Sequence, residues 1–234
     1  MLNKNHQQFA DLLKKHQQEI GKVVDFNPEK DRLFPFDFTA SNTSLSAETI
    51  ADTAAFSAWV DQILAQNNCK YGIGGYFENR TLYARSSHFS TLDEPRRLHL
   101  GVDIWGEAGT LVYAPFTGKI HSYADNNHFG DYGATIILEH CFYGQKFYAL
   151  YGHLNRASLQ GLFSGKTIQQ NEELARFGTS EENGNWPPHL HYQLMFDMEG
   201  KEGDYPGVCK LSDREKYLQN IPDPNVILRF PVQR

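Results

Sequence analysis

The stretch Pro187-Pro188-His189-Leu190-His191-Tyr192-Gln193 decides what fold to expect of this chain. The double proline is rigid, and the residues after it favour a strand that continues to Phe196. Successive side chains of a strand point to opposite faces, so His189 and His191 would share one face. Buried imidazoles need partners for their ring nitrogens. The pair therefore suits a metal ligand beside a catalytic group, although a structural or surface pair would have the same spacing.

A second motif lies well upstream, in Arg97-Leu98-His99-Leu100-Gly101-Val102-Asp103-Ile104-Trp105. The spacing of His99 and Asp103 places both on one face of a strand and also fits one helical turn, and the residues around Asp103 favour the strand. With one imidazole of the His-Leu-His pair, they make three protein ligands. Three ligands leave the fourth tetrahedral position for water, as in a catalytic zinc site. A further histidine, His153, lies between the two motifs in Tyr151-Gly152-His153-Leu154.

These three motifs, in this order, resemble those of the lysostaphin/LytM-type zinc metallopeptidases. The turns and strands between them, such as Gly109–Pro115 and Gly130–Gly133, are similar to that family too, and the resemblance covers about residues 88 to 200. It implies a mainly β fold, an antiparallel sheet with the duplicated hybrid motif of a lysostaphin-like core. Here an N-terminal helical and hairpin extension would precede that core.

By this resemblance, His99, Asp103 and His191 would bind zinc, while His153 and His189 would be catalytic without binding metal. His153 would accept a proton from the metal-activated water, a role that typically contributes about 10²–10⁴-fold. His189 would stabilise the oxyanion or protonate the leaving amine. Some members carry a substrate-aligning tyrosine just upstream of the first ligand, and Thr91 to Leu98 contains none. The other histidines are expected to be structural or solvated: His6, His16, His88, His121, His128 and His140.

The resemblance implies a zinc-dependent metalloendopeptidase acting on peptidoglycan-like or Gly/Ala-rich peptides. One loop, Gly178–Trp186, departs from the family because it is longer, acidic and carries a tryptophan. That loop borders the substrate groove in the family, so the substrate class stays open. Two alternatives are a catalytically silent binding or regulatory module and a zinc hydrolase with a non-wall cytoplasmic substrate. Silent relatives usually lose ligands, and all five site residues are present here, which favours the enzyme.

Composition restricts the partners. A net charge of −6 argues against nucleic acid as the main partner. The cysteines Cys69, Cys141 and Cys209 lie too far apart to predict a disulfide framework or a Cys-x-x-Cys metal site. No apolar signal region opens the sequence and no run is long enough to span a membrane, so we expect a cytoplasmic protein. The oligomeric state is not indicated.

We expect three segments: an N-terminal helical and hairpin extension (1–85), the zinc peptidase domain (86–200) and a C-terminal extension packed on the core (201–234). In the first segment the patterns predict helices over 3–21 and from Ser46 to Asn67, an extended piece over 33–38 and a hairpin over 71–83. Part of 33–85 would pack either beside the zinc groove, narrowing it, or on the far side.

Short strands separated by turns are predicted for the peptidase domain, at 111–114, 119–124, 134–140, 146–154 and 167–168. In the C-terminal extension, a short helix is expected over 213–218 and a last strand over 226–230.

Overall fold

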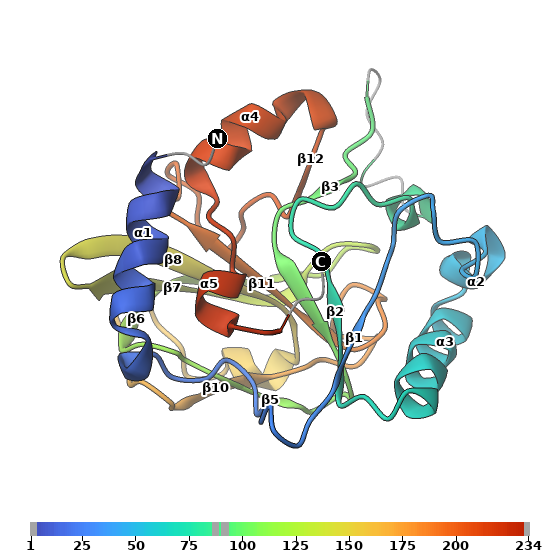
Figure 1. The fold of residues 1–234 in the computed structure, drawn as a ribbon, viewed down its shortest axis with the longest axis horizontal. Helices are drawn as coiled ribbons and strands as arrows, with labels where there is room; N and C mark the ends of the chain where they lie inside the picture. The colour runs from blue at the N-terminus through green and yellow to red at the C-terminus, as the bar shows by residue number, and fades with distance from the viewer. Residues whose placement is uncertain (1–3, 86–88, 90–93, 232–234) are drawn as a thin grey trace.

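The computed structural model describes residues 4–85, 89 and 94–231. Its centre is an eight-stranded sheet in the order β1-β2-β4-β11-β8-β7-β6-β9 (Figure 1). Neighbouring strands are antiparallel except β1 and β2, which are parallel. The mainly β fold predicted from the sequence is confirmed. The strands of this sheet are β1 (Leu33–Pro35), β2 (Tyr71–Gly74), β4 (Val102–Trp105), β6 (Gly118–Asn126), β7 (Gly133–Phe142), β8 (Gln145–Leu154), β9 (Thr167–Ile168) and β11 (His189–Met195).

Two small antiparallel pairs accompany the sheet: β5 (Leu111–Tyr113) with β10 (Glu173–Arg176), and β3 (Leu98–His99) with β12 (Val208–Cys209). The α-helices are α1 (Lys4–Lys15), α2 (Ala47–Ala51), α3 (Thr53–Gln66), α4 (Arg214–Asn220) and α5 (Asn225–Leu228). Short 3-10 helices are η1 (Gln17–Glu19), η2 (Leu82–Arg85), η4 (Arg156–Leu159) and η5 (Leu211–Asp213). Within the described residues, none of the helices combines the length and apolar character needed to cross a bilayer.

The two faces of β11 have different neighbours, and this places the site. Leu190, Tyr192 and Leu194 alternate onto one face and join the main hydrophobic core. Helix α1 closes that core, where the ring of Phe9 packs 5.1 Å from that of Phe147. The histidines of β11 occupy the opposite face. There α3 supplies a second core, and in Figure 1 α1 and the α2–α3 pair lie at opposite ends of the molecule.

The hairpin predicted over 71–83 is wrong. Tyr71–Gly74 forms β2, but β2 lies between β1 and β4, and the chain then turns into η2. The glycines of this stretch permit close packing: a Cβ on Gly72 would lie 2.1 Å from the ring of Phe36. A hairpin arm and a strand on which a side chain from elsewhere in the sequence packs closely can have the same alternation and the same glycines. The sequence therefore could not distinguish these two structures.

Other elements were predicted with mixed success. The helix expected from Ser46 to Asn67 is two helices, because Asp52 ends α2 and caps α3 by accepting a hydrogen bond from Ala55 N at 2.9 Å. The strand expected over 226–230 is wrong, since Asn225–Leu228 is helical. The helices near the N-terminus and over 213–218, and the extended piece at 33–38, are confirmed. So are the strands of the peptidase domain.

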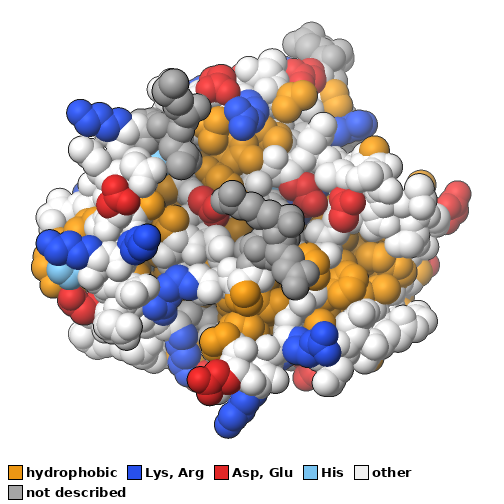
Figure 2. Space-filling view, viewed as in Figure 1, with side chains coloured by type: hydrophobic (Ala, Val, Ile, Leu, Met, Phe, Trp, Pro, Cys, Tyr) orange, Lys and Arg blue, Asp and Glu red, His pale blue; other side chains and the backbone are white. Residues whose placement is uncertain are grey.

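The division into segments at residues 85 and 200 remains a prediction. The structure shows that β1 and β2, both from the first segment, continue the sheet that contains β4 and β11. On the face seen in Figure 2, basic and acidic side chains are intermixed between apolar areas. Because β1 and β2 are strands of that sheet, the first segment is part of the same sheet as the site described next.

Candidate metal centre

Strand register brings the predicted ligands together. His191 on β11 lies opposite Asp103 on β4, and His189 lies opposite Trp105. His99 and Asp103, expected to share one face of a strand, lie on two strands, β3 and β4, because Leu100 and Gly101 interrupt the pairing. A Cβ on Gly101 would lie 2.6 Å from His191 Nε2, so only glycine leaves room for that ring at this break.

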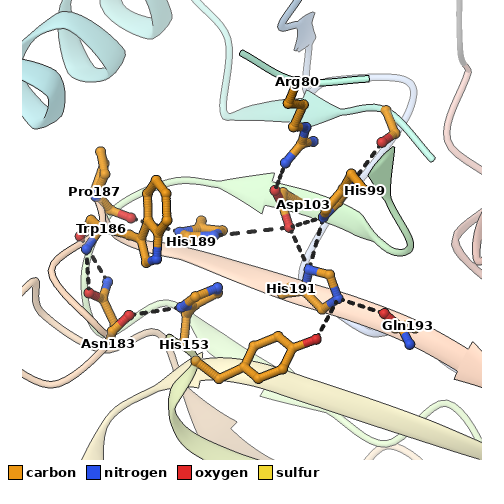
Figure 3. A network of polar contacts seen from close by, with 12 residues as sticks. Arg80, His99, Asp103, His153, Asn183, Trp186, Pro187, His189, His191 and Gln193 are labelled. Carbon is orange, nitrogen blue, oxygen red and sulfur yellow. Dashed lines mark hydrogen bonds and ion pairs between the residues drawn. The ribbon is translucent and has the colours of Figure 1, made fainter. Parts of the chain in front are cut away.

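Three ligand atoms of His99, Asp103 and His191 converge in the interior (Figure 3). His99 Nε2 lies 2.9 Å from His191 Nδ1 and 3.2 Å from Asp103 Oδ1, and the last two atoms are 3.0 Å apart. The far nitrogen of each ring is already a donor. His99 Nδ1 donates to Gly75 O at 2.9 Å, and His191 Nε2 donates to Gln193 Oε1 at 3.0 Å.

These tautomers leave three lone pairs facing one point. The orientation of Gln193 is set by its amide nitrogen, which donates to Pro206 O at 3.1 Å, so its oxygen faces His191. Three acceptors with no hydrogen between them are unfavourable unless a cation lies among them. Around tetrahedral zinc, ligand atoms lie about 3.3 Å apart. Two imidazole nitrogens and one carboxylate oxygen at these separations therefore fit a zinc ion.

His153 and His189 form a second pair beside the ligands. Their rings lie 4.1 Å apart, and Trp105 stacks on the other face of His189 at 3.9 Å. His153 Nδ1 donates to Asn183 O and His189 Nδ1 donates to Pro187 O, each at 2.8 Å. His153 has a φ of +63°, in the left-handed region that non-glycine residues seldom adopt. Both rings thus keep Nε2 as an acceptor, and neither belongs to the group of converging ligand atoms.

The interior keeps these imidazoles neutral. Burial, together with the positive charge of Arg80, lowers the pKa of His99 to about 3. Burial lowers the pKa of His189 to about 4, against the opposing effect of Asp103. Burial and the neighbouring histidines hold the pKa of His153 well below its usual range. For Asp103 burial opposes ionisation, but His99 and Arg80 outweigh it and hold its pKa well below the usual range. Neutral imidazoles beside an ionised carboxylate are the forms that bind a metal.

Several residues of the site were not predicted. Asn183, in the acidic loop, is fully buried. Its side-chain amide donates to Trp186 O and accepts from Trp186 N, each at 3.0 Å. The main-chain oxygen of Asn183 accepts the hydrogen bond that orients the ring of His153. Arg80 donates through Nη1 to Asp103 Oδ2 at 2.5 Å. Neither residue belongs to a motif, and a single Asn or Arg in a loop carries no periodic signal. Only Gln193, two positions after His191 on the same face of a strand, could have been found by alternation.

A cavity of about 140 Å³ adjoins the centre. Asp103, His153, His189 and His191 line it. Other parts of its wall come from the first segment, through Arg80, Leu82 and Tyr83, from Phe89, and from the C-terminal extension, through Asp204 to Val208. Part of the stretch 33–85 therefore lies beside the site, and whether it controls access stays a prediction.

The remaining histidines lie elsewhere or outside the description. His140 is buried among phenylalanines, and His6 packs on Phe196. Both are structural, as predicted. His88, expected in a loop, lies outside the described residues, as do residues 91–93 of the stretch Thr91 to Leu98 in which a tyrosine was sought.

Part of the chain is similar to known peptidases. The family model described as peptidase family M23 matches residues 97–203. The chain resembles the catalytic domain of lysostaphin from Staphylococcus simulans, with a TM-score of 0.40 and 19% identity over 70% of this chain and 97% of that one. It also resembles the catalytic domain of the M23 protein EnpA from Enterococcus faecalis, with a TM-score of 0.36 and 17% identity over 50% of this chain and 85% of that one.

A zinc-containing peptidase from Vibrio cholerae is similar as well, with a TM-score of 0.34 and 22% identity over 42% of this chain. This chain spans only 27% of that protein's length. No curated protein matches the chain. Residues 97–203 match peptidase family M23, and this segment contains all five predicted site residues, in agreement with the resemblance to the lysostaphin/LytM-type peptidases.

Proposed function

We propose that this chain is a zinc-dependent endopeptidase that hydrolyses peptide bonds in cell-wall-like or Gly/Ala-rich peptides. The observation that carries the proposal is the convergence of three lone pairs, from His99, Asp103 and His191, beside two further neutral imidazoles. A structural zinc site would have four protein ligands, whereas three leave a position open. Zinc held by these residues would supply Lewis acidity and a water whose pKa is about 7.

The two catalytic histidines divide the proton transfers. His153 donates from Nδ1 to Asn183 O, so its Nε2 is free to accept a proton from the attacking water. His189 likewise donates from Nδ1, and its Nε2 lies 4.0 Å from Asp103 Oδ1. The single proton that leaves the attacking water must reach the leaving amine. His153 would accept it first and pass it to His189, whose ring lies 4.1 Å away, and His189 would donate it to the amine. The Asp103 carboxylate would stabilise His189 while it carries this proton. The ring of His189 lies between the rings of Trp105 and His153, and these contacts fix it for this transfer.

The decisive experiment measures metal content and cleavage separately. The purified protein should hold one zinc per chain, and His191→Ala should lose it because two protein ligands remain. His121→Ala, at a histidine outside the centre, is the matched control and should keep the metal. A His191→Ala protein with full zinc would remove His191 from the ligand set.

Cleavage is tested by mass-spectrometric profiling of purified muropeptides and oligoglycines with the zinc-loaded protein. We expect hydrolysis of at least one of these peptides, and the cut bond would define the substrate class. A zinc-loaded protein that cleaves neither would contradict the proposed substrates. Loss of all peptidase activity on a broad peptide library would favour the catalytically silent module.

A further inference from the structure

Two of the three proposed ligands are held from outside by residues that precede the family match. Gly75 O accepts the hydrogen bond of His99 Nδ1 at 2.9 Å, and Arg80 Nη1 donates to Asp103 Oδ2 at 2.5 Å (Figure 3). The match to family M23 begins at residue 97. The partners of these ligands therefore come from the first segment of the chain.

Backbone hydrogen bonds fix this stretch, which we call the bracing segment (residues 74–80). Gly74 on β2 lies in register with Asp103 on β4. Beyond it, Phe77 N donates to His99 O at 2.8 Å, and His99 N donates to Glu78 O at 2.9 Å. Arg80 N then donates to Arg97 O at 2.9 Å. The segment is thus tied by main-chain bonds to both strands that carry the ligands.

The guanidinium of Arg80 is built into the interior. Its side chain is 1% exposed, and its Nε donates to Glu78 Oε2 at 2.6 Å while Nη1 reaches Asp103. The ring of Phe38 lies 5.2 Å below the guanidinium. A Cβ on Gly74 would lie 2.4 Å from Arg80 Nη2, so glycine is needed there for the arginine to fit. A buried charge is costly unless it is paired, and here two carboxylates pair it.

We propose that Arg80 is a positioning residue for the metal, and that the bracing segment is an integral part of the metal centre. The inference rests on the proposed zinc site. Arg80 engages Oδ2 of Asp103 and leaves Oδ1 pointing at His99 and His191. Because Arg80 holds Oδ2, the Asp103 carboxylate cannot rotate to present both of its oxygens to the ion. The arginine thereby keeps Asp103 a one-oxygen ligand and preserves the open position that the chemistry requires.

Direct measurement of zinc affinity, by competition with a coloured chelator, tests this role without using a substrate. Outer partners of metal ligands typically contribute 10–100-fold to affinity, so Arg80→Met should weaken zinc binding by about that factor. Arg80→Lys keeps the charge but lacks the planar fork whose Nε and Nη1 bond Glu78 and Asp103, so its affinity should lie between those of Arg80→Met and wild type. Gly74→Ala should weaken binding too, because it displaces the guanidinium.

The matched control is Arg156→Met, which breaks an Arg–Asp ion pair with Asp125 away from the centre. Its zinc affinity should equal that of wild type. Urea unfolding of each variant separates lost stability from lost affinity. Variants of Arg80 and Gly74 that are destabilised yet bind zinc as wild type does would overturn the inference. If Arg80→Met does not fold, Arg80→Lys and Gly74→Ala decide the question by the same criterion.

The outcome also distinguishes this inference from the proposed function. A wild-type protein that binds no zinc would refute the metal centre itself. A wild-type protein that binds zinc and cleaves no peptide would refute the endopeptidase, while the affinity ratios would still decide the role of Arg80.

Discussion

His140 provides a test of how the interior controls ionisation, at a position away from the proposed metal ligands. It lies on β7, 1% exposed, with its ring 5.1 Å from that of Phe147 and 5.8 Å from that of Phe116. Nδ1 lies 3.3 Å from Thr117 O, and Nε2 has no hydrogen-bond partner among the described residues. Burial lowers the pKa of His140 from 6.5 to about 4. The ring is therefore neutral in the folded protein at pH 5, where it is charged in the unfolded chain.

The sign and size of the effect follow from this difference. Below pH 6.5 the unfolded state binds a proton that the folded state accepts only near pH 4, so stability falls as the pH drops through that window. One unit of pKa difference corresponds to about 1.4 kcal/mol. Between pH 7 and pH 5, His140 should thus remove about 2 kcal/mol from the free energy of unfolding.

The perturbation is His140→Leu, which keeps apolar contact with both phenylalanines and removes the titrating ring. Urea unfolding of wild type and variant at pH 7 and pH 5 gives four free energies. The pH-dependent loss should be smaller in the variant by about 2 kcal/mol, while contributions from other histidines cancel in the comparison. Equal losses in the two proteins, or an NMR titration of folded His140 near pH 6.5, would refute the reasoning.

Three further predictions concern the site and its support. His153→Ala and His189→Ala should each keep zinc by metal analysis while turnover falls about 10²–10⁴-fold, because they move protons and bind no metal; zinc loss like that of His191→Ala would contradict the assignment. Asn183→Leu removes two buried hydrogen bonds to the main chain of Trp186, so urea unfolding should show a loss of about 2–4 kcal/mol, and an unchanged stability would contradict that role. Phe56→Ala should cost about 3–5 kcal/mol by the same assay, since Phe56 on α3 is fully buried in the second core; a cost below about 1 kcal/mol would mean that this core is loosely packed.

The placement of His189 and His191 on one face could be predicted because its geometry is local: two positions are one period of a strand, and both residues lie on β11. His99 and Asp103 were expected on one strand by the same rule but lie on β3 and β4. The identity of the strands also follows from composition, since β-branched and aromatic residues alternate between turns. Resemblance to a family then assigned the roles. For these features, the residues that matter lie within a few positions of one another.

Only the tertiary structure decided what surrounds the ligands. Arg80 is 23 positions from Asp103, and Asn183 is 30 positions from His153. No periodicity links residues so far apart, because their contact depends on which strands pair and in what register. The failed hairpin over 71–83 and the failed strand over 226–230 have the same origin. A short apolar run is compatible with either a helix or a strand. A glycine is compatible with either a turn or a site where another residue packs closely on the main chain. In both cases the packing partner decides the structure.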